Sequence, residues 1–174
     1  MRELSTGPRL GNTVAKQDLE RLMDHLEVAL EHGSYVKIDG QNCLGSHYIG
    51  EIFGAVGMDD PNFVEATLRK CAVSAGATIL QSNMHHFPSG GVTGIVILSE
   101  SHISIHSWPE HDYAAIDIFM CGNAKISEAV RVIETDFMPK RLVGKTLLRG
   151  QDGRVAEVSL PMSERLPVLS LSGL

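Results

Sequence analysis

The chain has 174 residues, enough for one globular domain with a sizeable core. Hydrophobic residues make up 43% and charged residues 21%, as in ordinary soluble proteins. The formal net charge of −6 argues against a general binder of nucleic acid or of anionic membranes, and no apolar stretch is long enough to span a bilayer.

The cysteines and the N-terminus indicate a cellular compartment. The first residues carry charges without an apolar run behind them, so no secretory signal is visible. The three cysteines, Cys43, Cys71 and Cys121, cannot all pair within one chain. Without an export signal, free thiols in a reducing environment are the simplest interpretation, and we expect a cytoplasmic protein.

The N-terminal part predicts a segment outside the main domain. Residues 1–12 lack periodicity and are interpreted as a loose leader. Apolar residues recur at helical spacing over 14–32, with a threonine before them and a glycine after them as caps, and 34–45 is expected to be a short connection. We therefore expect residues 1–40 to form a leader with an extra helix, and residues 41–174 to form a single domain.

The rest of the chain predicts strands interrupted by two helices. The expected strands span 47–56, 78–86, 92–98, 101–108, 113–120 and 140–148, and the expected helices span 60–74 and 126–137. Strands joined by short turns favour an α+β fold, a two-layer sandwich with a mainly antiparallel sheet and its helices on one face. The other face of the sheet then needs cover, so we expect a dimer in which the sheets of two protomers face each other.

The segment 91–110 is rich in Ser, Thr, His and Glu although it lies within apolar strands. Buried polar groups need partners, so such a segment contains either a satisfied network or a functional site. In the strand predicted over 101–108, alternation places His102, Ser104 and His106 on one side. Ser101, Ile103 and Ile105 then lie on the other side. A hairpin after Pro109 would return Cys121 to the neighbourhood of Ser101.

Four motifs follow one another at fixed spacing along this region. Residues 100–110 read Glu-Ser-His-Ile-Ser-Ile-His-Ser-Trp-Pro-Glu, and they are flanked by the motifs at 87–94, 113–122 and 44–47. In order and spacing these motifs resemble the short prokaryotic pyruvoyl-dependent S-adenosylmethionine decarboxylases. The resemblance covers roughly residues 44–150.

The resemblance implies that the chain is a zymogen that cuts itself between Glu100 and Ser101, giving the chains 1–100 and 101–174. Ser101 Oγ would attack the Glu100 carbonyl, and elimination from the resulting ester would leave a pyruvoyl group at position 101 as the covalent cofactor. That group would form a Schiff base with the amine of the substrate and accept electrons during decarboxylation. A hydroxyl is a weak nucleophile, so processing needs helpers near the bond.

The resemblance also assigns the helpers and the substrate contacts. His106 and Thr93 stand where the family has its processing residues, and Cys121 matches its proton donor. Three residues match its substrate site: Phe87 to stack on adenine, Leu44 on the other side of the ring, and Glu110 to accept hydrogen bonds from the ribose hydroxyls. The implied substrate is S-adenosylmethionine, the implied role is the supply of its decarboxylated form for spermidine biosynthesis, and the implied partner is a second copy of the chain.

No metal ion is expected, because His102 and His106 are separated by roughly 13 Å along the predicted strand.

Taken singly, the site residues are more often structural: a cysteine such as Cys43 or Cys71 is usually a small buried hydrophobe. Only the combined pattern favours catalysis.

The chain departs from the family pattern at three positions and at its N-terminus. Thr93 stands where Ser is commoner, Met120 replaces Thr, Ser46 replaces Arg, and about forty residues precede the usual start. Two alternatives therefore stay open: a pyruvoyl-dependent ornithine or arginine decarboxylase on the same scaffold, and a processing-dead homologue that regulates an active relative. Retention of Phe87 and Glu110 favours a nucleoside substrate.

Overall fold

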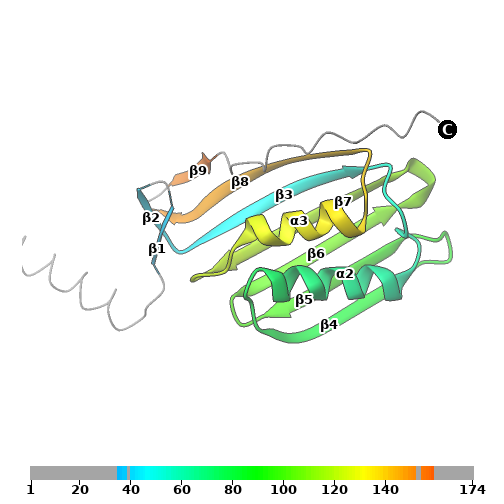
Figure 1. Cartoon of the computed structure of the whole chain (residues 1–174), viewed down its shortest axis with the longest axis horizontal. Coiled ribbons are helices and arrows are strands. Elements are labelled where there is room, and N and C mark those ends of the chain that lie inside the picture. Colours follow the sequence, from blue (N-terminus) through cyan, green and yellow to red (C-terminus); the bar gives the residue numbers. More distant parts are fainter. Residues whose placement is uncertain (1–34, 39, 152–153, 159–174) are drawn as a thin grey trace, which may run out of the picture. The chain divides into compact units, whose positions relative to one another are not determined.

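The computed structural model describes residues 35–38, 40–151 and 154–158 (Figure 1). The helix predicted over 14–32 lies outside these residues. The described part contains an antiparallel sheet of seven strands in the order β4-β5-β6-β7-β3-β8-β9. Its strands are β3 (Gly45–Phe53), β4 (Ile79–His86), β5 (Val92–Leu98), β6 (Ser101–Trp108), β7 (Tyr113–Cys121), β8 (Arg141–Gln151) and β9 (Arg154–Val158).

Two helices, α2 (Pro61–Ser74) and α3 (Ile126–Asp136), lie on the same face of this sheet (Figure 1). The Asp60 carboxylate caps α2 by accepting hydrogen bonds from the backbone N–H groups of Asn62 and Phe63, and Pro61 occupies the first turn. The expected α+β fold with helices on one face of an antiparallel sheet is therefore confirmed. No helix in the described residues is long and apolar enough to cross a membrane.

The predicted strands and helices agree with the observed elements to within a few residues, with two exceptions. Residues 34–45 are not a simple connection, because β1 (Val36–Ile38) and β2 (Gln41–Cys43) pair there as a small separate sheet. Strand β9 also had no predicted counterpart. Strands β1, β2 and β9 have three to five residues each, too few to show a hydrophobic period in the sequence. Cys43 of β2 is buried by Leu148 and Val158, which are distant in the sequence.

The core lies between the sheet and the two helices. Alternate strand residues point toward the helices and are fully buried, among them Ile52, Ile103, Ile105, Ile116 and Ile118. Val64 and Leu68 of α2 and Ile133 of α3 fill the space above them. The strict alternation of buried and half-buried positions along β7 shows why the sequence pattern predicted a strand with one core face.

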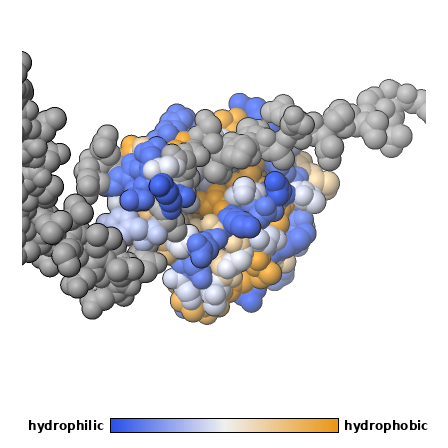
Figure 2. Space-filling model, turned by 60° about the vertical axis from the view of Figure 1, so that its left-hand side comes forward, coloured by the Kyte–Doolittle hydropathy of each residue, from blue (hydrophilic) through white to orange (hydrophobic). Residues whose placement is uncertain are grey.

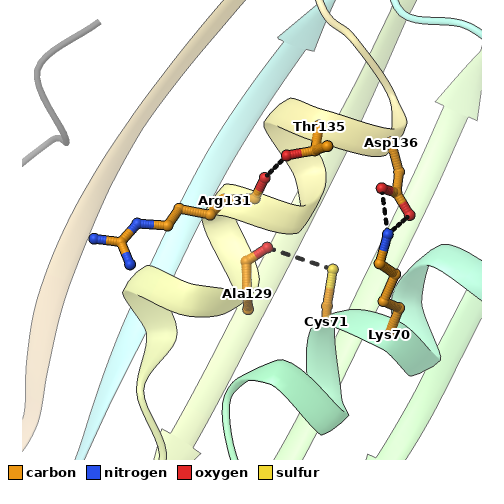
Figure 3. A network of polar contacts seen from close by, with 6 residues as sticks. All are labelled: Lys70, Cys71, Ala129, Arg131, Thr135 and Asp136. Carbon is orange, nitrogen blue, oxygen red and sulfur yellow. Dashed lines mark hydrogen bonds and ion pairs between the residues drawn. The ribbon is translucent and has the colours of Figure 1, made fainter. Parts of the chain in front are cut away.

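Polar contacts also join the two helices to each other (Figure 3). Lys70 Nζ donates to both carboxylate oxygens of Asp136, at 2.7 and 2.9 Å. The buried Cys71 thiol donates to the Ala129 carbonyl at 3.4 Å, and burial raises the pKa of Cys71 to about 12. Cys71 therefore stays a protonated thiol at neutral pH and serves as a packing residue.

We expect Leu68→Ala to lower the free energy of unfolding by about 2–5 kcal/mol, because it leaves a cavity between α2 and the sheet. Val73→Ala on the same helix is the matched control, since Val73 is 67% exposed and its truncation should change stability by about 0.5 kcal/mol or less. Urea unfolding at one fixed protein concentration measures both values. Equal losses in the two variants would contradict the burial of Leu68.

Candidate active site

The turn between β5 and β6 contains the bond that the sequence analysis predicted to be cut. Leu98 pairs with Ser101, so Ser99 and Glu100 form a two-residue loop. Ser101 has a φ angle of +143°, and only two other non-glycine residues in the described part of the chain have positive φ. An L-residue in this region of backbone space is strained by about 1–3 kcal/mol. The Glu100–Ser101 peptide therefore adjoins a residue in an unfavourable conformation.

The carbonyl oxygen of Glu100 accepts two hydrogen bonds from Cys121, one from its backbone N–H at 3.0 Å and one from its Sγ at 2.9 Å. This contact exists because β6 and β7 pair in a register that places Met120 opposite Ser101. Two donors on a carbonyl oxygen polarise it and stabilise negative charge that develops there during nucleophilic attack. The predicted return of Cys121 to the neighbourhood of Ser101 is confirmed.

The hydroxyl of Ser101 lies 3.2 Å from Nδ1 of His102. Strand alternation predicted these two side chains on opposite faces, and the burial of Ile103 and Ile105 agrees with that alternation farther along β6. The positive φ takes Ser101 out of regular strand geometry, and its hydroxyl lies near the His102 ring. His102 was not among the residues to which the sequence analysis gave a role. Its position directly after Ser101 in the motif was the available signal, but only the backbone torsion reveals the contact.

Thr93 and His106 form a second pair, with 3.0 Å between Thr93 Oγ1 and His106 Nδ1. They are direct neighbours across β5 and β6, on the face of the sheet opposite the helices. His106 lies five residues beyond Ser101 on the same strand, a separation of roughly 16 Å. One protomer therefore does not bring this pair to its own Ser101.

The predicted substrate residues are likewise divided between the two ends of the sheet. Phe87 follows the end of β4, is 42% exposed and packs edge-on against His85 with ring centroids 4.5 Å apart. Glu110 is exposed in the short 3-10 helix η1 (Pro109–His111), which follows β6 at the same end. Leu44 is also exposed but precedes β3 at the Ser101 end, where Gly45 pairs with Cys121.

A further polar network lies on the open face of the sheet, which is the face opposite the two helices. The sequence did not predict this network. His47 Nε2 lies 3.2 Å from an Asp117 oxygen, and Arg149 Nη1 lies 3.1 Å from His47 Nδ1. The Phe119 ring contacts both His47 and His102, at centroid distances of 5.4 and 6.1 Å. Burial lowers the pKa of His47, and the Asp117 charge opposes this shift only in part. The network depends on strands β3, β7 and β8, which are far apart in sequence.

The two substitutions nearest the site, Ser46 and Met120, do not lie on this open face. They pair directly across β3 and β7, and both side chains are buried on the helix side of the sheet. Met120 belongs to the core cluster and Ser46 is 8% exposed. These departures therefore change packing beneath the turn rather than the surface that carries His102 and His106.

Figure 2 shows hydrophobic and hydrophilic residues interspersed on one side of the molecule. On the open face of the sheet, the half-exposed apolar side chains Ile49, Ile97 and Trp108 alternate with charged and imidazole groups. No helix of the described residues covers this face (Figure 1). The predicted dimer, with two such faces in contact, stays a prediction.

Comparison with known proteins gives the family. A family model for S-adenosylmethionine decarboxylase matches residues 46–150, more than half of the chain. The chain belongs to the S-adenosylmethionine decarboxylase family. Among curated relatives, the S-adenosylmethionine decarboxylase proenzyme of Pseudomonas paraeruginosa is 34% identical over 137 residues, covering 76% of this chain and 86% of the relative. That of Methanococcus maripaludis is 40% identical over 119 residues, covering 66% and 98%.

A solved structure agrees with this family assignment. The adenosylmethionine decarboxylase of Aquifex aeolicus VF5 superimposes with a TM-score of 0.56 at 33% sequence identity, covering 62% of this chain and 92% of that one. The matched residues 46–150 contain the β5–β6 turn, Cys121 and the Thr93–His106 pair. The family resemblance that the sequence motifs indicated is thereby confirmed.

We expect the pKa of His47 to lie below the ordinary value of about 6.5, because its burial disfavours the imidazolium. Asp117→Asn should lower it further by removing an attraction for that cation. Because the pKa of His47 is lower in the folded chain than in the unfolded chain, the unfolded chain takes up a proton at His47 first as the pH falls. His47 therefore lowers the free energy of unfolding only below about pH 6.5. NMR titration of a Ser101→Ala protein measures the shift, with Asp60→Asn as the remote control. A His47 midpoint above 6.5 would contradict the assignment.

Proposed function

We propose that this chain is a self-processing, pyruvoyl-dependent decarboxylase of S-adenosylmethionine. The observation that carries the proposal is the strained Ser101 beside a Glu100 carbonyl that receives two hydrogen bonds from Cys121. Strain on the amide side and charge stabilisation on the carbonyl side are what a hydroxyl needs to displace an amide. The curated relatives are named as proenzymes, which supports a chain that is made as a precursor.

Processing begins when Ser101 Oγ attacks the Glu100 carbonyl carbon. An ester bond forms, the C–N bond breaks, and residue 101 gains a free amine, while the two Cys121 donors hold the developing oxyanion. Loss of the α-proton of residue 101 then expels Glu100 as a carboxylate and leaves dehydroalanine. Tautomerisation and hydrolysis by water release ammonia and leave the pyruvoyl group at the start of residues 101–174.

The residues around the turn fit the cofactor that this reaction creates. A pyruvoyl group supplies a ketone next to an amide, which draws electrons away from a departing carboxylate. Cys121 holds its thiol at this position, half-buried, and we assign it as the donor of the proton to the product carbon. His102, within hydrogen-bonding distance of Ser101 Oγ, orients that hydroxyl before attack.

The complete site requires two protomers. Thr93, His106, Phe87 and Glu110 lie at one end of the sheet, and Ser101, Cys121 and Leu44 lie at the other. A two-fold dimer with the open faces in contact brings opposite ends together and builds two equal sites. In each site the Thr93–His106 pair of one copy assists cleavage in the other, and an adenine ring lies between Leu44 and Phe87 of different copies.

Phe87 and Glu110 support a nucleoside substrate rather than ornithine or arginine. An exposed aromatic face suits a cationic sulfonium nucleoside, and an exposed carboxylate suits a ribose diol. We propose that the product, decarboxylated S-adenosylmethionine, supplies spermidine biosynthesis. Cys71 and Cys121 carry free thiols, which supports a cytoplasmic location.

The purified chain should appear by intact mass as two chains, 1–100 and 101–174, the second blocked to N-terminal sequencing. It should release CO₂ from carboxyl-labelled S-adenosylmethionine and not from ornithine or arginine. Ser101→Ala should stay a single chain without activity, because it lacks the attacking hydroxyl. An uncleaved wild-type chain after long incubation would favour a processing-dead regulator, and release of CO₂ from ornithine or arginine would favour the alternative substrates.

Co-expression of two inactive variants tests the shared site. Ser101→Ala and His106→Ala chains should each stay uncleaved when expressed alone, because each lacks one member of the assembly. Together, with different tags, they should yield a cleaved His106→Ala chain, since its Ser101 then meets the partner copy's intact Thr93–His106 pair. The matched control is His106→Ala co-expressed with a chain carrying both substitutions, which should give no cleavage. Rescue in that control, or none in the test, would refute assembly from two copies.

A further inference from the structure

The side chain of Glu100, and not only its carbonyl, is bound at the cleavage turn. One carboxylate oxygen of Glu100 accepts a hydrogen bond from the backbone N–H of Thr78 at 2.8 Å. Thr78 lies in the connection between α2 and β4, and its own carbonyl accepts the backbone N–H of Ser99 at 3.0 Å. The connection before β4 is thus hydrogen-bonded to both residues of the two-residue loop.

The sequence of this loop does not suit its length. Two-residue hairpin loops favour type I′ or II′ turns, which need positive φ within the loop and therefore select Gly, Asn or Asp. Neither Ser99 nor Glu100 has positive φ, and the positive φ falls on Ser101, the first residue of β6. A turn of this kind is not maintained by local preference, so contacts from outside the hairpin must hold it.

Two such contacts converge on Glu100 from different elements. Cys121 at the end of β7 holds the carbonyl oxygen, and Thr78 before β4 holds the carboxylate. The peptide group between Glu100 and Ser101 is therefore held at its carbonyl oxygen by Cys121. The Glu100 side chain is held on the other side of the hairpin by Thr78. Rotation that would relax the φ angle of Ser101 has to break at least one of these contacts.

We propose that the Glu100 carboxylate is a positioning residue for self-processing, which binds the Thr78 amide and thereby keeps Ser101 in its strained conformation beside the scissile carbonyl. The inference rests on the proposed self-cleavage and adds to it a role for the side chain on the acyl side of the bond. The carboxylate takes no proton from Ser101 and does not touch the substrate. Its effect is on the population of the conformer that is ready for attack.

The test measures the half-time of cleavage of freshly purified precursor by intact mass. We expect Glu100→Ala to lengthen the half-time about tenfold, because the hydrogen bond from the Thr78 amide is lost. Glu100→Gln should stay within about threefold of wild type, since its amide oxygen can still accept that hydrogen bond. Ser99→Ala, in the same loop, is the matched control and should cleave at the wild-type rate because its backbone N–H is retained.

A change on the donor side tests the same contact. Thr78→Pro removes the backbone N–H and should slow cleavage to a similar extent, whereas Thr78→Ala keeps the N–H and should not. Glu100→Ala combined with Thr78→Pro should be little slower than either alone, because both remove one hydrogen bond. Melting temperatures of each change in a Ser101→Ala chain, which cannot cleave, show whether the fold is intact.

The outcomes separate this inference from the proposed function. If the wild-type chain does not cleave, the proposed function fails. If the wild-type chain cleaves and Glu100→Ala cleaves equally fast with an unchanged melting temperature, only the role of the carboxylate is overturned. Equal slowing by Glu100→Gln and Glu100→Ala, or additive effects of the Glu100 and Thr78 changes, would also overturn it.

Discussion

The site depends on one backbone conformation, the positive φ of Ser101, which the surrounding sheet imposes on a residue that disfavours it. Isolated from the sheet, the β5–β6 turn would relax, because its loop residues do not suit a tight hairpin. The register between β6 and β7 prevents this by fixing the Glu100 carbonyl against Cys121. A strain of about 1–3 kcal/mol is small beside the burial of a complete hydrophobic core, so the fold can maintain it.

The same sheet separates the chemistry into two halves. Helices α2 and α3 cover one face, and the polar and aromatic groups of interest lie on the other face or at the ends of the strands. Because a strand is rigid and extended, residues five apart such as Ser101 and His106 cannot approach each other within one sheet. This geometry supports our proposal that each copy supplies what the other lacks, an arrangement in which the exposed face of the sheet contacts a partner copy.

The departures from the family pattern take on a different meaning once they are placed in the structure. Ser46 and Met120 are cross-strand neighbours whose side chains enter the core below the cleavage turn. The short Ser46 and the long Met120 are both accommodated in the closely packed layer between the sheet and the helices. The open face, with Phe119, His102 and the His47 network, is untouched by these two changes.

The sequence by itself determined the family, the α+β class, most strands and both described helices, because hydrophobic periodicity and capping signals such as Asp60-Pro61 are local. It also placed Cys121 beside Ser101, since a hairpin with short connections leaves little choice. Tertiary structure alone decided the contact between Ser101 and His102, the binding of Glu100 to Thr78, and the network around His47. Each of these depends on strand order, register or a single unfavourable torsion, and none of the three leaves a periodic trace in the chain. Sequence and structure together determined the distance between Ser101 and the Thr93–His106 pair. The motif places His106 five residues after Ser101, and the extended strand keeps residues at that spacing apart within one protomer.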